Sequence, residues 1–146
     1  MSERAEQMRA PTSFWIVASV SLIWNLIGVI NYLFSVTVSE HSLAAMPEAE
    51  RALYTDVPVF VTSCFAIAVF SGVLGSVFLL LRKAQSVSLF LVSLVAIILQ
   101  MSLGVLLTPM LAVQGPGALV FPVVLVACAV FFLYYSRKVT AQGLLH

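Results

Sequence analysis

The chain has 146 residues, of which 62% are hydrophobic and 9% are charged, and its mean hydropathy is +1.10. Soluble domains carry about 45–50% apolar and about 25% charged residues, so this composition excludes a soluble globular domain. The net charge of +1 comes without a basic block, which argues against nucleic acid as a partner. We expect membrane lipid to surround this protein instead.

Four apolar segments, each long enough to cross a bilayer as a helix, occupy most of the chain. We therefore predict an all-α, integral membrane four-helix bundle that forms a single domain over residues 1–146. Packing between helices in lipid, rather than burial away from water, is expected to hold this domain together. The four helices are expected at about 14–38, 57–81, 86–107 and 118–136.

The connection between the first two helices, residues 39–56, holds four of the six acidic residues. Its apolar side chains recur at helical spacing, and Pro47 suits the first turn of a short helix. We expect an amphipathic segment that lies at the outer membrane surface and caps the bundle. A solvated loop is the alternative.

The positive charges predict the orientation of the helices in the membrane. Six of the seven Lys and Arg residues fall on one side of the predicted bundle, and only Arg51 falls on the other. Because short cytoplasmic segments carry an excess of positive residues, we expect both termini in the cytoplasm. The six residues are Arg4, Arg9, Arg82, Lys83, Arg137 and Lys138.

The four predicted spans contain no Asp, Glu, Lys, Arg or His. A proton relay, a haem held by paired histidines or an intramembrane protease needs such groups within the membrane. A metal site at Glu40 and His41 is not expected either, because one neighbouring pair supplies too few ligands. We therefore expect no enzymatic activity, no cofactor and no metal site.

The segment Trp24–Tyr32 (WNLIGVINY) places two carboxamides inside the first apolar segment. Asn25 and Asn31 point about 120° apart around a helix, and Gly28 and Tyr32 add to the same broad polar face. A carboxamide without a partner is costly in hydrocarbon, so both side chains should face protein or a hydrated cavity.

Asn31 and Gln100 each lie seven residues before the outer end of an outward-running helix. At about 1.5 Å per residue, both carboxamides lie about 10 Å below the outer surface. Ser63, near the start of the inward-running second helix, reaches a similar depth. We expect these three side chains to form a polar layer, which is either a set of interhelical hydrogen bonds or the floor of a ligand pocket.

The second helix carries small residues four positions apart, a pattern that lets another helix approach closely. With glycines of the first and third helices, these residues are expected to form packing faces; the wall of a ligand path is the alternative. The expected packing residues are Gly28, Ala68, Gly72, Gly75, Ser76 and Gly104.

Three stretches resemble known proteins: WNLIGVINYL at 24–33, SGVLGSVFLLLRK at 71–83 and SLFLVSL at 88–94. Through them, residues 11–95 resemble a group of small four-helix bacterial membrane proteins that often carry the label "sugar transporter". The resemblance implies the four-helix fold and a location in the bacterial inner membrane. One four-helix chain is small for alternating access, so transport would require a homo-oligomer.

Uncharged polar groups in membrane segments without ionisable residues indicate hydrogen bonding to a neutral or amphipathic ligand. We therefore expect binding or transport of such a small molecule or lipid, which would reach the bundle from its outer side. The alternative is an accessory or scaffolding subunit that docks helices of other membrane subunits. The candidate ligand-binding residues are Asn25, Asn31, Tyr32, Ser63 and Gln100.

Overall fold

The computed structural model describes residues 9–146, a range in which the regular structure is entirely helical and no strand occurs. Arg4, one of the residues that predict the orientation, lies outside the described residues. The four long helices are α2 (Thr12–Val36), α5 (Val59–Leu80), α6 (Ser86–Leu107) and α8 (Val120–Ala141). Shorter helices connect them: α3 (Glu40–Ala45), α4 (Glu48–Thr55), α7 (Met110–Gln114) and the 3-10 helix η1 (Pro116–Leu119).

Each of the four long helices is long and apolar enough to cross a membrane, with η1 and α8 counted as one continuous segment, Pro116–Ala141. The prediction of an all-α chain with four long apolar helices is confirmed. This is the architecture of a multi-pass membrane protein.

The helix ends differ from the predicted ones by a few residues, for local reasons. α2 begins directly after Pro11 and ends at Val36, whereas α6 has the predicted range. α8 continues to Ala141, beyond the expected end at 136, because no Gly or Pro follows Pro122 of its first turn until Gly143. Gly143 has φ 74°, a backbone conformation that glycine adopts readily, and it follows the end of the helix.

Residues 39–56 form two short helices. α3 is capped by Ser39, whose hydroxyl accepts a hydrogen bond from the backbone N–H of Ser42 at 3.1 Å. Pro47 then separates α3 from α4, in which the first turn carries Glu48 and Glu50, where acidic side chains are favourable. α4 contacts α7, so the two short segments meet across one end of the molecule.

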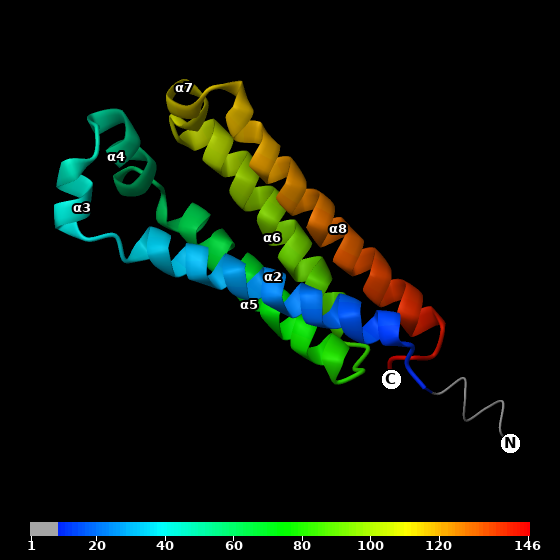
Figure 1. The fold of residues 1–146 in the computed structure, drawn as a ribbon. Helices are drawn as coiled ribbons and strands as arrows, with labels where there is room; N and C mark the ends of the chain where they lie inside the picture. The colour runs from blue at the N-terminus through cyan, green and yellow to red at the C-terminus, as the bar shows by residue number, and fades with distance from the viewer. Residues whose placement is uncertain (1–8) are drawn as a thin grey trace, which may run out of the picture.

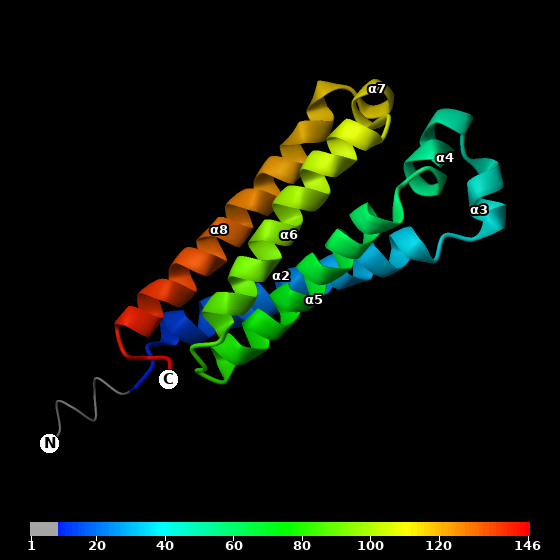
Figure 2. The same ribbon diagram turned by 180° about the vertical axis from the view of Figure 1, so that it is seen from behind.

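The long helices pack in the order α2, α5, α6, α8, and each contacts chiefly its neighbour in that order. Figures 1 and 2 show that the α2–α5 pair and the α6–α8 pair converge at the end where both termini lie. The pairs diverge toward the end that carries α3, α4 and α7. The bundle is therefore V-shaped, closed at one end and open at the other.

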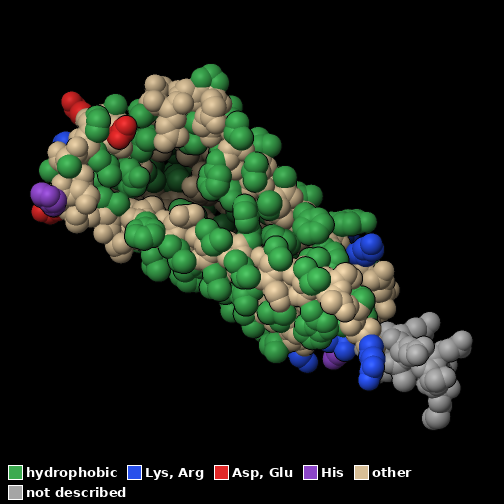
Figure 3. All heavy atoms as spheres, viewed as in Figure 1, with side chains coloured by type: hydrophobic (Ala, Val, Ile, Leu, Met, Phe, Trp, Pro, Cys, Tyr) green, Lys and Arg blue, Asp and Glu red, His purple; other side chains and the backbone are tan. Residues whose placement is uncertain are grey.

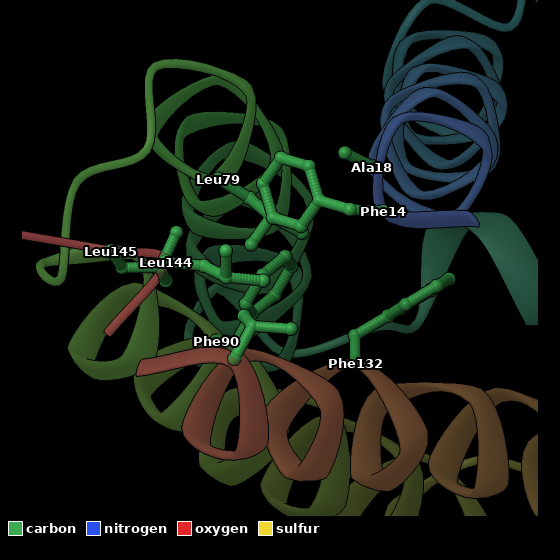
Figure 4. Close-up of a cluster of buried hydrophobic side chains, with 8 residues drawn as sticks. Phe14, Ala18, Leu79, Phe90, Phe132, Leu144 and Leu145 are labelled. Carbon is green, nitrogen blue, oxygen red and sulfur yellow. The ribbon is translucent and has the colours of Figure 1, made fainter. Parts of the chain in front are cut away.

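The hydrophobic core lies at the closed end (Figure 4). Phe14 and Leu79 are fully buried there, and Phe90 stacks on Phe132 with 5.9 Å between ring centroids. This cluster joins all four long helices and fixes the point from which the pairs diverge. Its members are Phe14, Ala18, Leu79, Phe90, Phe132, Val139, Leu144 and Leu145.

The C-terminal segment completes this end by pairing with the turn between α5 and α6. The backbone N–H of His146 donates to the carbonyl of Arg82, and the N–H of Ala84 donates to the carbonyl of His146. The Arg82 side chain donates from Nε to the carbonyl of Leu144 at 2.9 Å. Arg82 itself has φ 57°, which turns the chain from α5 into α6.

Charged residues separate to the two ends of the molecule (Figure 3). The described cations at the closed end are Arg9, Arg82, Lys83, Arg137 and Lys138. The open end carries Glu40, Glu48, Glu50 and Asp56 together with Arg51.

Candidate functional site

A cavity of about 460 Å³ lies between the two helix pairs, in the open part of the V. All four long helices contribute to it, and most of its wall is aliphatic or aromatic. Three carboxamides, Asn25, Asn31 and Gln100, provide most of its polar groups. The lining consists of Trp24, Asn25, Ile27, Gly28, Asn31, Phe65, Ala68, Val69, Ile97, Gln100, Met101, Phe121 and Leu125.

Asn25 lies in the deeper part of the cavity and is held by neighbouring hydroxyls. Its Nδ2 donates to the carbonyl of Ser21 at 2.8 Å and to Oγ of Ser76 at 3.3 Å. Ser76 donates its own proton to the carbonyl of Gly72 at 2.9 Å, so the Ser21 hydroxyl donates to Ser76, at 2.7 Å. Both serines are fully buried. The hydrogen bond that Asn25 donates to Ser76 and the one between Ser21 and Ser76 therefore stabilise the contact between α2 and α5.

Gly72 makes room for the Asn25 carboxamide. A Cβ at position 72 would lie 2.0 Å from Oδ1 of Asn25 and 3.2 Å from Oγ of Ser93. Ser93 in turn donates to the carbonyl of Ala68 at 2.7 Å, which joins α6 to α5. Three helices thus meet around a glycine near the middle of α5, and Asn25 is part of that junction.

Asn31 and Gln100 differ from Asn25 because neither side chain hydrogen-bonds to another group within residues 9–146. Asn31 is exposed and Gln100 is half-buried, and both line the cavity. Gln100 also faces a smaller cavity of about 210 Å³ beneath α4, which it shares with Tyr54. Asn31 and Tyr54 together border a groove beside α3. The two carboxamides are therefore free to bind a ligand.

The expected polar layer requires Ser63 to lie near Asn31 and Gln100. The structure does not bring these three side chains together. Ser63 is exposed and donates to the carbonyl of Val59 in its own helix at 2.9 Å. It lines a separate groove with Tyr32. The ring of Tyr32 packs edge-on against Phe65, with 5.4 Å between centroids. One residue along a helix is a turn of about 100°, which takes Tyr32 away from the face of Asn31.

Most of the small residues predicted to pack do lie in close contacts. A Cβ on Gly28 would lie 3.2 Å from Val69, and one on Gly75 would lie 3.1 Å from the Phe90 ring. Ala68 and Ser76 are buried. The prediction for Gly104 is wrong: no atom lies within 4 Å of the position of its Cβ. Gly104 is near the C-terminal end of α6, where the helix pairs have diverged.

Several residues of the site carried no signal in the sequence. Phe121, Leu125 and Met101 read as ordinary apolar residues of membrane helices, yet they form one wall of the cavity. Tyr54 lies in the amphipathic segment, and only the fold places it in grooves that Asn31 and Gln100 also line. The sequence offers one signal for Tyr54: it is a polar aromatic residue in an amphipathic segment expected to cap the bundle at the membrane surface.

No acid, base or nucleophile lines the cavity among the residues that the structure describes. The described part of the chain also contains no group of three His, Cys, Asp or Glu residues that could hold a metal ion. Comparison with protein-family models, curated proteins and solved structures finds no match. The arrangement itself offers hydrogen-bond donors and acceptors without charge, set in apolar walls. Its chemistry is that of binding an uncharged molecule.

Proposed function

We propose that this protein binds a neutral or amphipathic small molecule or lipid in the cavity between its helix pairs, as a binding or transport protein of the bacterial inner membrane. The observation that supports this proposal is the pair of free carboxamides, Asn31 and Gln100, in an otherwise apolar wall. A carboxamide in hydrocarbon without a partner is unfavourable by several kcal/mol. A ligand with hydrogen-bonding groups supplies the partner that the helices do not.

The alternative role, as an accessory subunit that docks partner helices, has less support. Its expected docking surfaces were the polar face of α2 and the small-residue face of α5, and the second of these is already occupied. Gly72, Gly75 and Ser76 are buried within this chain, against α2 and α6. That face is therefore covered before any partner arrives, which favours the binding role.

Leucine variants of the two free carboxamides distinguish a ligand site from interhelical hydrogen bonding. Asn31→Leu and Gln100→Leu, singly and together, should leave the free energy of unfolding unchanged or higher, because no bond within the described chain is lost. Ser21→Ala provides the contrast, since its hydroxyl bonds Ser76 at 2.7 Å. The measurement is denaturation in detergent followed by circular dichroism.

The same variants test binding by native mass spectrometry of protein released from lipid nanodiscs. Wild-type protein should retain a neutral lipid, quinone or sugar-like molecule, and the double variant should lose it. Ser102→Leu, on the exposed side of α6 and outside the cavity, is the matched control and should retain the molecule. A wild-type protein that carries no such molecule, or a double variant that retains it equally well, contradicts the proposal.

A further inference from the structure

We infer that the cavity takes its ligand sideways from the bilayer, between α2 and α8, and that the ligand is a single-chain lipid with an uncharged, hydroxyl-bearing headgroup. This inference rests on the proposed function and specifies both the route and the class of ligand. It replaces the expected approach from the outer aqueous side.

The cavity opens on the side of the molecule. α2 and α8 are the two flanking helices of the packing order, and they form its edges through Ile27 and Phe121. Figure 3 shows a hollow on the face that carries these helices, bordered by hydrophobic side chains. Phe121 is 57% exposed. Because the long helices cross the membrane, an opening between their flanks faces lipid chains rather than water.

Parts of the chain lie across both ends of the molecule, in the path of an axial approach. At the outer end, α4 contacts α7 and so spans the mouth of the V. At the other end, Phe90 stacks on Phe132 beneath Asn25, and the core that includes Phe14 fills the space between the helices. The lateral opening between α2 and α8 is therefore the direct route into the cavity.

The polar groups in the upper cavity determine the headgroup. Asn31 and Gln100 both donate and accept hydrogen bonds, and neither carries charge. Tyr54 of α4 adds a hydroxyl group nearby, because it lines one groove with Gln100 and another with Asn31. No cation lines the cavity within the described chain, so a phosphate would be desolvated there without a counterion, which is unfavourable. Hydroxyl groups match these side chains.

The lower cavity suits one apolar chain. Its wall there is formed by Trp24, Ile97 and Leu125, which also line a much smaller pocket of about 10 Å³ that reaches Ala129. A volume of about 460 Å³ lies within the usual range for small-molecule sites, about 300–1,000 Å³, which suits one chain better than two. The two free carboxamides lie above, and the wall below is apolar apart from Asn25, whose amide already donates to Ser21 and Ser76. This vertical order is that of a lipid with its headgroup toward the outer surface.

Photolabelling in nanodiscs of phosphatidylethanolamine and phosphatidylglycerol tests this inference. The probe is a monoacylglycerol with a diazirine in its acyl chain. Adducts should concentrate in peptides around Ile27 and Leu125, and unlabelled monoacylglycerol should compete. Leu125→Trp should reduce these adducts to background by filling the cavity, whereas Val124→Trp, on an exposed position of α8 outside the lining, should not. The double variant of Asn31 and Gln100 should lower labelling roughly tenfold, as expected from losing two hydrogen bonds to the ligand.

Two further probes separate the possible failures. A chainless diazirine glycerol ether should not label the cavity; if it labels as well as the lipid, the ligand is water-soluble, and the inference is wrong while the proposed function stands. A probe with the same chain and a phosphate headgroup should label weakly. If it labels as strongly as the monoacylglycerol probe, the inference of an uncharged headgroup is wrong. Labelling by no probe above the level of Leu125→Trp contradicts both the inference and the proposed function. If Leu125→Trp does not fold, two wild-type measurements replace it: whether the adducts lie around Ile27 and Leu125, and whether unlabelled monoacylglycerol competes. Adducts elsewhere, or no competition, contradict the inference.

Discussion

Asn25 and Gly72 show how single residues hold a polar group within the membrane region of this protein. The Asn25 carboxamide donates to Ser21 and Ser76, and its oxygen occupies space that any side chain at position 72 would fill. A glycine in a membrane helix is therefore required here by a close approach, not by backbone conformation. The junction is a structural site, whereas Asn31 and Gln100 above it are free for a ligand.

Gly72→Ala should destabilise the protein by about 1–3 kcal/mol, because its Cβ would collide with Oδ1 of Asn25. Gly104→Ala is the matched control, since it adds the same methyl group to open space. It should be neutral or stabilise by about 0.5–1 kcal/mol, because alanine loses less backbone entropy in a helix than glycine. Denaturation in detergent measures both. Equal effects of the two substitutions would contradict the proposed close contact.

The Ser21–Ser76 hydrogen bond should be measurable as a coupling energy between α2 and α5. A double-mutant cycle with Ser21→Ala and Ser76→Ala should give about 0.6–1.7 kcal/mol, the range for interhelical hydrogen bonds in membrane proteins. Ser63→Ala serves as the control, because Ser63 is exposed and bonds only within α5. A coupling energy of zero would show that the two hydroxyls do not interact in the membrane.

At the scale of elements, α3 and α4 are joined by Arg51. Its Nε donates to the carbonyl of Leu43 at 2.9 Å, and one terminal nitrogen donates to the carbonyl of Met46 at 3.1 Å. Both carbonyls lie at the end of α3, where the regular helical hydrogen bonds stop, and that of Leu43 also accepts from the backbone N–H of Met46 at 3.2 Å. Arg51, the single cation at the open end among the described residues, therefore has a structural role there.

Arg51→Ala should loosen the α3–α4 cap without unfolding the long helices. The two hydrogen bonds from a charged group stabilise the cap by about 1.5–3 kcal/mol each, so amide hydrogen exchange in residues 40–55 should accelerate at least severalfold. Exchange in α5 and α6 should stay the same. Glu50→Ala, an exposed change in the same helix, controls for loss of charge. Unchanged exchange in the cap would contradict this role for Arg51.

At the scale of the whole molecule, the V shape combines a fixed end with an open one. The aromatic and aliphatic core joins all four long helices near the termini, and the C-terminal backbone pairs with the turn between α5 and α6. Farther along, the helix pairs diverge, and no large core residue fills the space between them. A cavity in an otherwise packed helical membrane protein follows from this geometry.

The separation of charge predicts that the closed end faces the cytoplasm. In a background with Cys64→Ala and Cys128→Ala, single cysteines at Glu48→Cys and Lys138→Cys test this with a membrane-impermeant maleimide. The cysteine at position 48 should react in intact bacterial cells, and the one at position 138 only after permeabilisation. The opposite pattern would invert the orientation and place the carboxamides in the inner leaflet.

Much of this architecture could be predicted because it depends on properties of single helices. Length and hydropathy define the four long helices, and the fixed rise per residue places Asn31 and Gln100 at one depth. The structure puts these two side chains in one cavity. The periodicity of the small residues likewise indicated the close approach at Gly72 and Gly75.

What the sequence determined by itself was which segments form helices and how far along each helix a residue lies, because both follow from local backbone geometry and hydropathy. Only the tertiary structure decided which neighbour each helix face meets. It turned Ser63 away from the carboxamides, left Gly104 without a contact and placed Tyr54 in two smaller grooves, one shared with Gln100 and one with Asn31. These outcomes depend on the angle between the helix pairs. That angle is set by the fit of side chains such as Phe14 and Phe90 in the core, which no single helix contains.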